Sequence, residues 1–338
     1  MSDETVRALT LPLVRGLVPL PAPGRGAFLR AEADPTLPAG LLCEQSLKPA
    51  YDALAAAGNH VTRRIEGRFD LILCRLTGDK AENRATLARA WEHLAPGGTW
   101  IAAGPKETGA ASLEAECAAA FPLAGTLAKY HCRVFWAQKT TPQPPALLES
   151  WTAAAQPGPY PGPGYSTRPG LFSWREIDPG SRLLVEALPA DLSGRGADLG
   201  AGWGYLAVET LRRAAPACRL DLYEAEALAL EAAQRALTAA GLAERATLHW
   251  ADVAADPLPD RAYDFVVMNP PFHRGKQTDI GLGQAFLAAA ARMLRPGGRL
   301  LLVANRQLPY ERLLREQFAT VTPLAETGLY KVIAATRG

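Results

Sequence analysis

The chain has 338 residues, of which 48% are hydrophobic, so it is long enough to bury two separate cores. Its 36 basic and 34 acidic residues leave a net charge of +2, and so small an excess does not by itself indicate a nucleic-acid binder. The 5 cysteines are scattered without a CxxC pair, which argues against a zinc knuckle and a disulfide framework.

Two features bear on localisation. The first residues are acidic and the stretch after them is broken by prolines, which is not typical of a signal peptide. No apolar run reaches the roughly 20 residues that a membrane span needs. We therefore expect a cytoplasmic protein that does not contact a membrane.

The chain divides into three parts. Residues 1–139 carry predicted strands near 68–76, 99–104 and 130–139, with a helix before the second of them. Residues 140–169 are dense in proline and glycine, which predicts an inter-domain linker with one short helix near 147–155. Residues 170–338 form the second predicted domain.

The second domain alternates strand and helix patterns, which predicts an α/β fold with a mostly parallel sheet flanked by helices. Strands are predicted near 196–199, 218–225, 246–253, 263–269, 299–305 and 330–337, and helices near 205–215, 226–241, 283–295 and 309–318.

The first domain repeats part of this plan. "RFDLILCRL" is similar to "AYDFVVMNP", and the spacing from Gly98 to Tyr130 equals that from Gly298 to Tyr330. The first copy has Arg75 where the second has Asn269, and it lacks a glycine-rich turn. We therefore expect two similar folds, of which only the second is catalytic.

A glycine turn follows the first strand of the second domain, in the order Asp198, Gly200, Gly202 and Gly204. Glycines allow a tight turn and a close approach of a ligand to the main chain. The acidic residue in front would repel a pyrophosphate but suits a cationic amino-acid group. Some glycine turns hold nothing, so this motif alone is weak.

Two further carboxylates end the next strands. Glu224 could accept hydrogen bonds from the hydroxyls of a ribose, or it could be a solvated residue at a helix start. Asp252 could accept from an adenine amino group, or it could cap a loop.

The run Asn269-Pro270-Pro271-Phe272 ends a fourth strand. The asparagine side-chain oxygen and the carbonyl of Pro270 can both accept from an –NH₂ group, and the prolines fix the backbone that aims them. Phe272 offers a face on which a planar ring can stack. Together with the glycine turn, this favours a binding corner over a simple strand exit with a core phenylalanine.

These motifs resemble the class I S-adenosylmethionine-dependent methyltransferases that modify exocyclic or amide nitrogens. More narrowly, "LFSWREIDPGSRLLVEALP", "ADLGAGWGYLAV", "MNPPFHRGKQTD" and "TGLYKVIAATRG" resemble the bacterial ribosomal RNA guanine-N2 methyltransferases of the RsmC and RlmG type, with the RsmC type favoured. The resemblance covers nearly all of residues 170–338.

The resemblance implies two tandem Rossmann-like domains, each with a seven-stranded mostly parallel sheet, of which the N-terminal copy is degenerate and supports the fold or positions RNA. It implies transfer of a methyl group from S-adenosylmethionine, leaving S-adenosylhomocysteine, to the N2 amine of a guanine in ribosomal RNA, with 16S RNA of the small subunit favoured. We expect a monomer that needs no metal ion.

The resemblance also implies residue roles. Asp198, Gly200, Gly202 and Gly204 would line the methionine part of the cofactor, Glu224 would hold the ribose, and Asp252 with Val253 would hold the adenine. Asp178 and Ser181 match a stretch that closes over the cofactor end of the site. Asn269, Pro270 and Phe272 would hold the guanine. Apart from the resemblance, Arg274, Lys276, Arg306 and Arg312 follow strand ends on the same edge of the sheet and could hold RNA phosphates, as could His273. His273 could instead accept a proton.

One departure concerns the strand before the glycine turn. Its sequence, "SGRGADLG", has few apolar residues, so we expect this strand to be short or to start late.

Other functions remain open on the sequence alone. They are a 23S RNA guanine-N2 methyltransferase, an adenine-N6 or glutamine-amide methyltransferase, a nicotinamide-dependent Rossmann enzyme, and a non-catalytic RNA-binding assembly factor.

Overall fold

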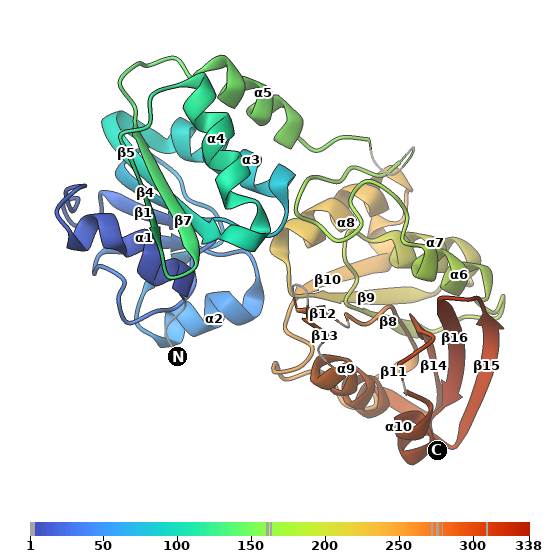
Figure 1. Cartoon of the computed structure of the whole chain (residues 1–338). Helices are drawn as coiled ribbons and strands as arrows, with labels where there is room; N and C mark the ends of the chain where they lie inside the picture. The colour runs from blue at the N-terminus through green and yellow to red at the C-terminus, as the bar shows by residue number, and fades with distance from the viewer. Residues whose placement is uncertain are drawn as a thin grey trace. The chain divides into compact units, whose positions relative to one another are not determined.

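The computed structural model describes residues 4–338 except 160, 161, 163, 272, 275, 276, 279 and 309. Its residues form two compact units (Figure 1). Unit 1 comprises Met1–Gln156 with Arg168–Gly170, and unit 2 comprises Pro157–Thr167 with Leu171–Gly338. Among the described residues, no helix combines the length and the apolarity needed to cross a membrane.

Unit 1 is a seven-stranded sheet in the order β3-β2-β1-β4-β5-β7-β6, in which only the pairs made by β7 are antiparallel. The strands are β1 Gly26–Leu29, β2 Leu41–Glu44, β3 His60–Thr62, β4 Phe69–Arg75, β5 Leu94–Pro105, β6 Gly125–Lys129 and β7 Cys132–Gln138. The helices are α1 Glu4–Val14, α2 Lys48–Ala56, α3 Lys80–His93, α4 Ala110–Ala120 and α5 Ala146–Ala155.

Unit 2 repeats this architecture, with the order β10-β9-β8-β11-β14-β16-β15. The strands are β8 Arg195–Leu199, β9 Arg219–Glu224, β10 Ala246–Trp250, β11 Tyr263–Met268, β14 Leu294–Asn305, β15 Thr320–Glu326 and β16 Tyr330–Thr336, with a small hairpin of β12 His273–Arg274 and β13 Gln277–Thr278. The helices are α6 Pro179–Glu186, α7 Tyr205–Arg213, α8 Ala227–Ala239, α9 Ile280–Met293 and α10 Tyr310–Gln317. The prediction of two seven-stranded, mostly parallel sheets is confirmed.

The two units match strand by strand. The equal spacing in the sequence predicted that Tyr130 corresponds to Tyr330, and this prediction is wrong. Arg299 of β14 lies opposite Thr336, and Thr99 of β5 lies opposite Gln138. The connection in unit 1 is therefore two residues longer, and Cys132 rather than Tyr130 corresponds to Tyr330. Equal spacing in the sequence hid this difference, because Tyr130 lies in a turn with a left-handed backbone, φ 52°.

The segment expected as a linker is divided between the units. Helix α5 buries Leu148 and Trp151 in a cluster with Trp91 of α3, which belongs to unit 1. Further along, Gly158 and Thr167 pair as an isolated antiparallel bridge within unit 2.

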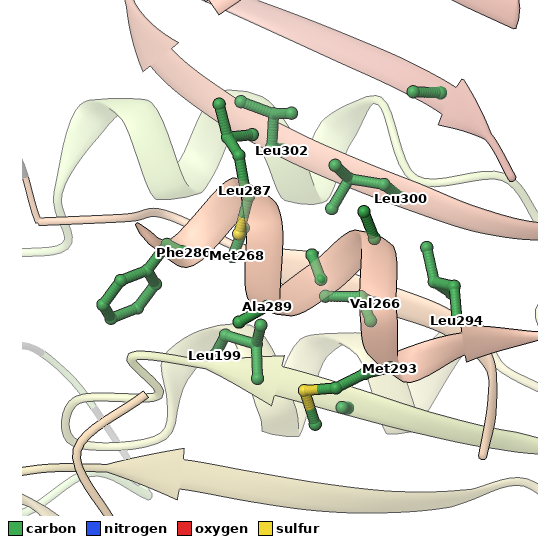
Figure 2. Close-up of a cluster of buried hydrophobic side chains, with 14 of the residues drawn as sticks. Leu199, Val266, Met268, Phe286, Leu287, Ala289, Met293, Leu294, Leu300 and Leu302 are labelled. Atoms are coloured by element: carbon green, nitrogen blue, oxygen red, sulfur yellow. The ribbon is translucent and has the colours of Figure 1, made fainter. Parts of the chain in front are cut away.

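One core of unit 2 lies between α9 and the central strands of its sheet. Figure 2 shows α9 side chains packed among side chains of β8, β11 and β14. Leu199 and Met268, the last residues of β8 and β11, are both fully buried there. This packing fixes the points at which these two strands end.

The strand before the glycine turn is short, as expected, with 5 residues. A β-carbon on Gly196 would lie 2.2 Å from Cζ of Phe265, so the phenyl ring of the neighbouring strand occupies the space that a side chain on β8 would need. The apolar volume that β8 lacks is supplied by β11.

We expect Gly196→Ala to lower the free energy of unfolding by about 1–3 kcal/mol, because the added methyl group overlaps a buried ring that has no room to move. Urea unfolding measures this loss. Gly328→Ala serves as a control, because its β-carbon would meet no described atom within 4 Å, and we expect a change of about 0.5 kcal/mol or less. Equal effects of the two substitutions would contradict this account.

Candidate active site

The ends of β8 and β11 form the floor of a cavity in unit 2. These strands are parallel neighbours with Leu199 opposite Met268, so the residues that follow, Gly200 and Asn269, emerge side by side. The cavity has a volume of about 50 Å³. It is lined by Phe172, Ser173, Asp178, Ser181, Gly200, Ala201, Gly202, Trp203, Tyr205, Leu206 and Asn269. The structure thus brings five predicted site residues to one cavity, namely Asp178, Ser181, Gly200, Gly202 and Asn269.

The three glycines of the turn share a left-handed backbone but have different surroundings. All have positive φ values, 73° at Gly200, 54° at Gly202 and 89° at Gly204. A β-carbon on Gly202 would meet no described atom within 4 Å, so this position leaves open space beside the main chain. A β-carbon on Gly204 would lie 2.9 Å from Cα of Ala233, so this glycine lets α7 pack closely on α8. Gly204 does not line the cavity.

Asp198 is fully buried at the end of β8, and neither of its carboxylate oxygens has a hydrogen-bond partner among the described residues. Burial, and then the nearby carboxylate of Glu224, raises the pKa of Asp198 to about 8. A buried carboxylate without a partner is unfavourable, and a cation bound beside it would remove that penalty. Asp198 therefore has the environment of a site for a positively charged ligand group.

Glu224 ties the end of β9 to the glycine turn. One carboxylate oxygen accepts from the backbone N–H of Gly202 at 2.7 Å, and the other accepts from the N–H of Glu226 at 2.8 Å. Burial raises the pKa of Glu224 as well. A carboxylate oxygen has two lone pairs, so Glu224 could still accept a ligand hydroxyl.

Asp252 and Val253 lie at the same edge of the sheet but do not line the cavity. They follow β10, whose last residue, Trp250, lies opposite Glu224. The Asp252 side chain accepts from the N–H of Ala254 at 2.9 Å, as in the loop-capping alternative, and Val253 is buried.

The Asn269 corner is held by side-chain contacts that its own motif does not reveal. The amide nitrogen donates to Oδ2 of Asp178 and to Oγ of Ser181, both at 2.9 Å. Pro270 is buried and Pro271 is exposed, so the chain leaves the sheet at this point.

The other residues predicted to contact the substrate are described only in part or not at all. Phe272 and Lys276 are outside the described residues, as are the side chains of His273 and Arg274, whose backbone forms β12.

Phe172 is a cavity residue that the sequence reasoning missed. Its side chain is 65% exposed, although its backbone carbonyl accepts from Nε1 of Trp203 at 2.9 Å. The next residue, Ser173, has a left-handed backbone with φ 48°. The aromatic residues in "LFSW" ahead of Asp178 were the available signal, but a sequence does not distinguish an exposed ring from a core ring.

The corresponding edge of unit 1 is filled by ion pairs. Arg30 directly follows β1, where Gly200 follows β8, and its guanidinium pairs with Glu82. Arg89 pairs with the buried Glu44 at the end of β2. Arg75 stands where unit 2 has Asn269, as predicted. The described side chains of unit 1 therefore provide charge pairs where unit 2 provides a glycine turn.

Within the described part of the chain, no three histidine, cysteine, aspartate or glutamate residues gather in a way that could hold a metal ion.

A glycine turn beside an Asn-Pro-Pro corner on a sheet of this order is the arrangement of class I methyltransferases. The family model for the methyltransferase small domain matches residues 164–334. The ribosomal RNA small subunit methyltransferase C of Psychromonas ingrahamii is 32% identical over 84% of this chain and 81% of its own length. Its counterpart in Shewanella pealeana is 31% identical over 78% and 76%.

A solved structure agrees with these relatives over both units. The 16S rRNA guanine-N2 methyltransferase RsmC of T. thermophilus, solved with AdoMet and guanosine, is 26% identical with a TM-score of 0.79. The match covers 99% of this chain and 92% of the other. The chain therefore belongs to the ribosomal RNA small subunit methyltransferase C family, and the resemblance seen in the sequence is confirmed.

We expect Asp198→Asn to stabilise the ligand-free protein by an amount that grows between about pH 5 and about pH 8. Folded Asp198 ionises at a pKa of about 8, whereas an unfolded aspartate ionises near a pKa of about 4. Its contribution to stability is present below about pH 4 and is lost as the pH rises towards 8, by at most about 1.4 kcal/mol per pH unit. Asparagine has no such proton to lose.

Urea unfolding across this pH range measures the difference. Asp191→Asn is the control, because Asp191 pairs with Arg299 at the surface and its pKa is lowered by that pair, so its ionisation is complete before this range begins. A stability gap for Asp198→Asn that stays constant with pH would show that Asp198 is already ionised in the folded protein.

Proposed function

We propose that this protein transfers a methyl group from S-adenosylmethionine to the exocyclic N2 amine of a guanine in 16S ribosomal RNA. The observation that carries the proposal is the shared cavity: the Asn269 side chain and the Gly200–Gly202 turn line the same space. An acceptor for a substrate amine thus stands next to a turn suited to a methyl donor. The related proteins described above act on small-subunit ribosomal RNA.

The residues present fit S-adenosylmethionine. Asp198 offers a buried carboxylate without a partner to the cationic end of the cofactor, and Gly202 leaves open space beside the main chain. Glu224 would accept from the ribose hydroxyls, and Asp252 with Val253 would address the adenine. When bound, the cofactor supplies an electrophilic methyl group on a positively charged sulfur.

The Asn269 corner would hold the nucleophile. The lone pair of a guanine amine is delocalised into the ring, so transfer requires that the nitrogen be held with its lone pair directed at the methyl carbon. The Asn269 oxygen and the Pro270 carbonyl would accept from the two amine hydrogens. The same contacts stabilise the positive charge that develops on nitrogen as the new bond forms. The nitrogen then loses one proton, for which water is a sufficient acceptor.

The substrate base must leave its stack to reach such a corner. We assign to Phe272 the face on which it stacks and to Phe172, which is exposed at the cavity, a second aromatic contact. His273, Arg274 and Lys276 would contact phosphates. Arg306 and Arg312, the other two candidates for phosphate contacts, form ion pairs with Glu326 and Glu316 within the protein.

Unit 1 would then support the fold and position RNA without binding cofactor, because its equivalent edge is occupied by the pairs of Arg30 and Arg89. We assign the three parts of the chain as a degenerate domain at 1–139, a connection at 140–169 whose parts pack with one unit or the other, and a catalytic domain at 170–338. We propose that the protein acts as a monomer on ribosomal RNA or the small subunit in the cytoplasm.

We expect labelled S-adenosylmethionine to yield N2-methylguanosine in small ribosomal subunits from cells that lack the enzyme. Incubation with separated subunits, followed by nucleoside analysis, measures this. Label in the large subunit would shift the target to 23S RNA. N6-methyladenosine or labelled protein would contradict the proposed reaction, and absence of cofactor binding in calorimetry would point to a non-catalytic RNA-binding role.

We expect Asn269→Ala to reduce turnover by at least about 100-fold while cofactor affinity survives, because the change removes an acceptor that acts on the substrate amine. Single-turnover kinetics and calorimetry separate the two quantities. Asn59→Ala controls for loss of an asparagine side chain, because Asn59 lies in the turn after α2 of unit 1, where its amide donates to the carbonyl of Leu54. Unchanged turnover of Asn269→Ala would refute the role assigned to this residue.

A further inference from the structure

Asp178 and Ser181 lie at the start of α6, far in sequence from Asn269, and both contact its side chain. The Asn269 amide nitrogen donates one hydrogen bond to Asp178 Oδ2 and one to Ser181 Oγ. An amide nitrogen has two hydrogens, so both of its donors are used within the protein. No described residue donates to the Asn269 oxygen, which lies on the other side of the amide.

These contacts leave only one orientation for the amide. A carboxylate oxygen accepts hydrogen bonds and cannot donate them, so the side of Asn269 that faces Asp178 must be the –NH₂ side. Turning the amide over would place two oxygens against each other in a partly buried place, at the cost of a lost charge-assisted hydrogen bond. The side that faces away from Asp178 must therefore be the oxygen.

The start of α6 is itself held in place. Asp178 is the N-cap of α6, and the same Oδ2 atom accepts from the backbone N–H of Ser181 at 2.7 Å. A β-carbon on Gly180 would lie 2.9 Å from the ring of Tyr330 and 3.0 Å from Oδ2 of Asp178. Gly180 is therefore packed between the Tyr330 ring and the Asp178 carboxylate, and the bond to the Ser181 N–H holds that carboxylate at the start of α6.

We infer that Asp178 and Ser181 are positioning residues that orient the Asn269 amide so that its oxygen always addresses the substrate amine. This inference rests on the proposed function and changes the role given to these two residues, from cofactor binding to substrate alignment. An unconstrained asparagine would present its –NH₂ group part of the time, which repels an amine. The fixed amide is a pure acceptor before the substrate arrives.

Substitution of Asp178 tests this with a graded series. Asp178→Ser retains a good helix cap but is too short to reach Asn269, and we expect kcat to fall by about 10- to 100-fold at unchanged affinity for S-adenosylmethionine. Asp178→Asn retains an oxygen at the position of Oδ2, so we expect it to keep most of the activity. Ser181→Ala removes the second acceptor, and its effect should lie between the two.

Asp79→Ser is the matched control, because Asp79 caps α3 in unit 1 by accepting from the N–H of Glu82 at 2.9 Å. We expect it to change neither kcat nor cofactor affinity. If Asp178→Ser weakens cofactor binding but retains kcat at saturating cofactor, the two residues bind cofactor and the inference is wrong. Unchanged kcat and affinity would overturn it as well.

A measurement without substrate separates this inference from the proposed reaction. The side-chain ¹⁵N–H₂ signals of Asn269, assigned by their loss in Asn269→Ala, should be protected from hydrogen exchange in the wild type and in Asp178→Asn. They should lose that protection in Asp178→Ser. Signals that exchange freely in the wild type would refute the fixed amide even if methyl transfer to guanine is observed. Protected signals with no transfer to RNA would leave the hydrogen bonds standing and refute the proposed function.

Discussion

The parallel pairing of β8 with β11 is the constraint on which the candidate site of unit 2 depends. Because Leu199 lies opposite Met268, the chain must leave the sheet at adjacent points, and it does so through a glycine turn on one strand and a proline corner on the other. The side chains of α9 bury the last residue of both strands (Figure 2). The spacing between the glycine turn and the proline corner is therefore set by a hydrophobic core and not by the loops themselves.

Much of this could be predicted, because it follows from local patterns. Alternating strands and helices predicted the sheet, and carboxyl ends of parallel strands share an edge, so Gly200, Gly202 and Asn269 could be placed together. The short β8 was foreseen from its few apolar residues. Its cause was not, since the ring of Phe265 that replaces a side chain at Gly196 belongs to another strand. The role of Gly204 was also hidden, because its close neighbour is Ala233 on the following helix.

Contacts over long sequence distances account for what could not be predicted. Asp178 and Asn269 are separated in the sequence by the whole segment from β8 to β11. Nothing in either motif indicates that the Asp178 carboxylate accepts a hydrogen bond from the Asn269 amide. The two-residue shift between the units could not be seen in the sequence. Gly98 and Tyr130 have the same spacing as Gly298 and Tyr330, although Tyr130 lies in a turn and Tyr330 lies in a strand. The exposure of Phe172 depends on how the segment before α6 folds, and its sequence is equally compatible with a core residue.

The ion pairs at the edge of unit 1 limit the mutational paths open to that domain. Removing Arg30 alone leaves the largely buried carboxylate of Glu82 without its cation. Removing Glu82 alone leaves the Arg30 guanidinium without the carboxylate that pairs with it. The pair formed by Arg89 and Glu44 imposes the same condition on the neighbouring strand. A single substitution in either pair therefore costs stability, which opposes stepwise conversion of this edge into a cofactor site. Paired charges thus preserve a difference between the two sheet edges, however closely the two sheets correspond.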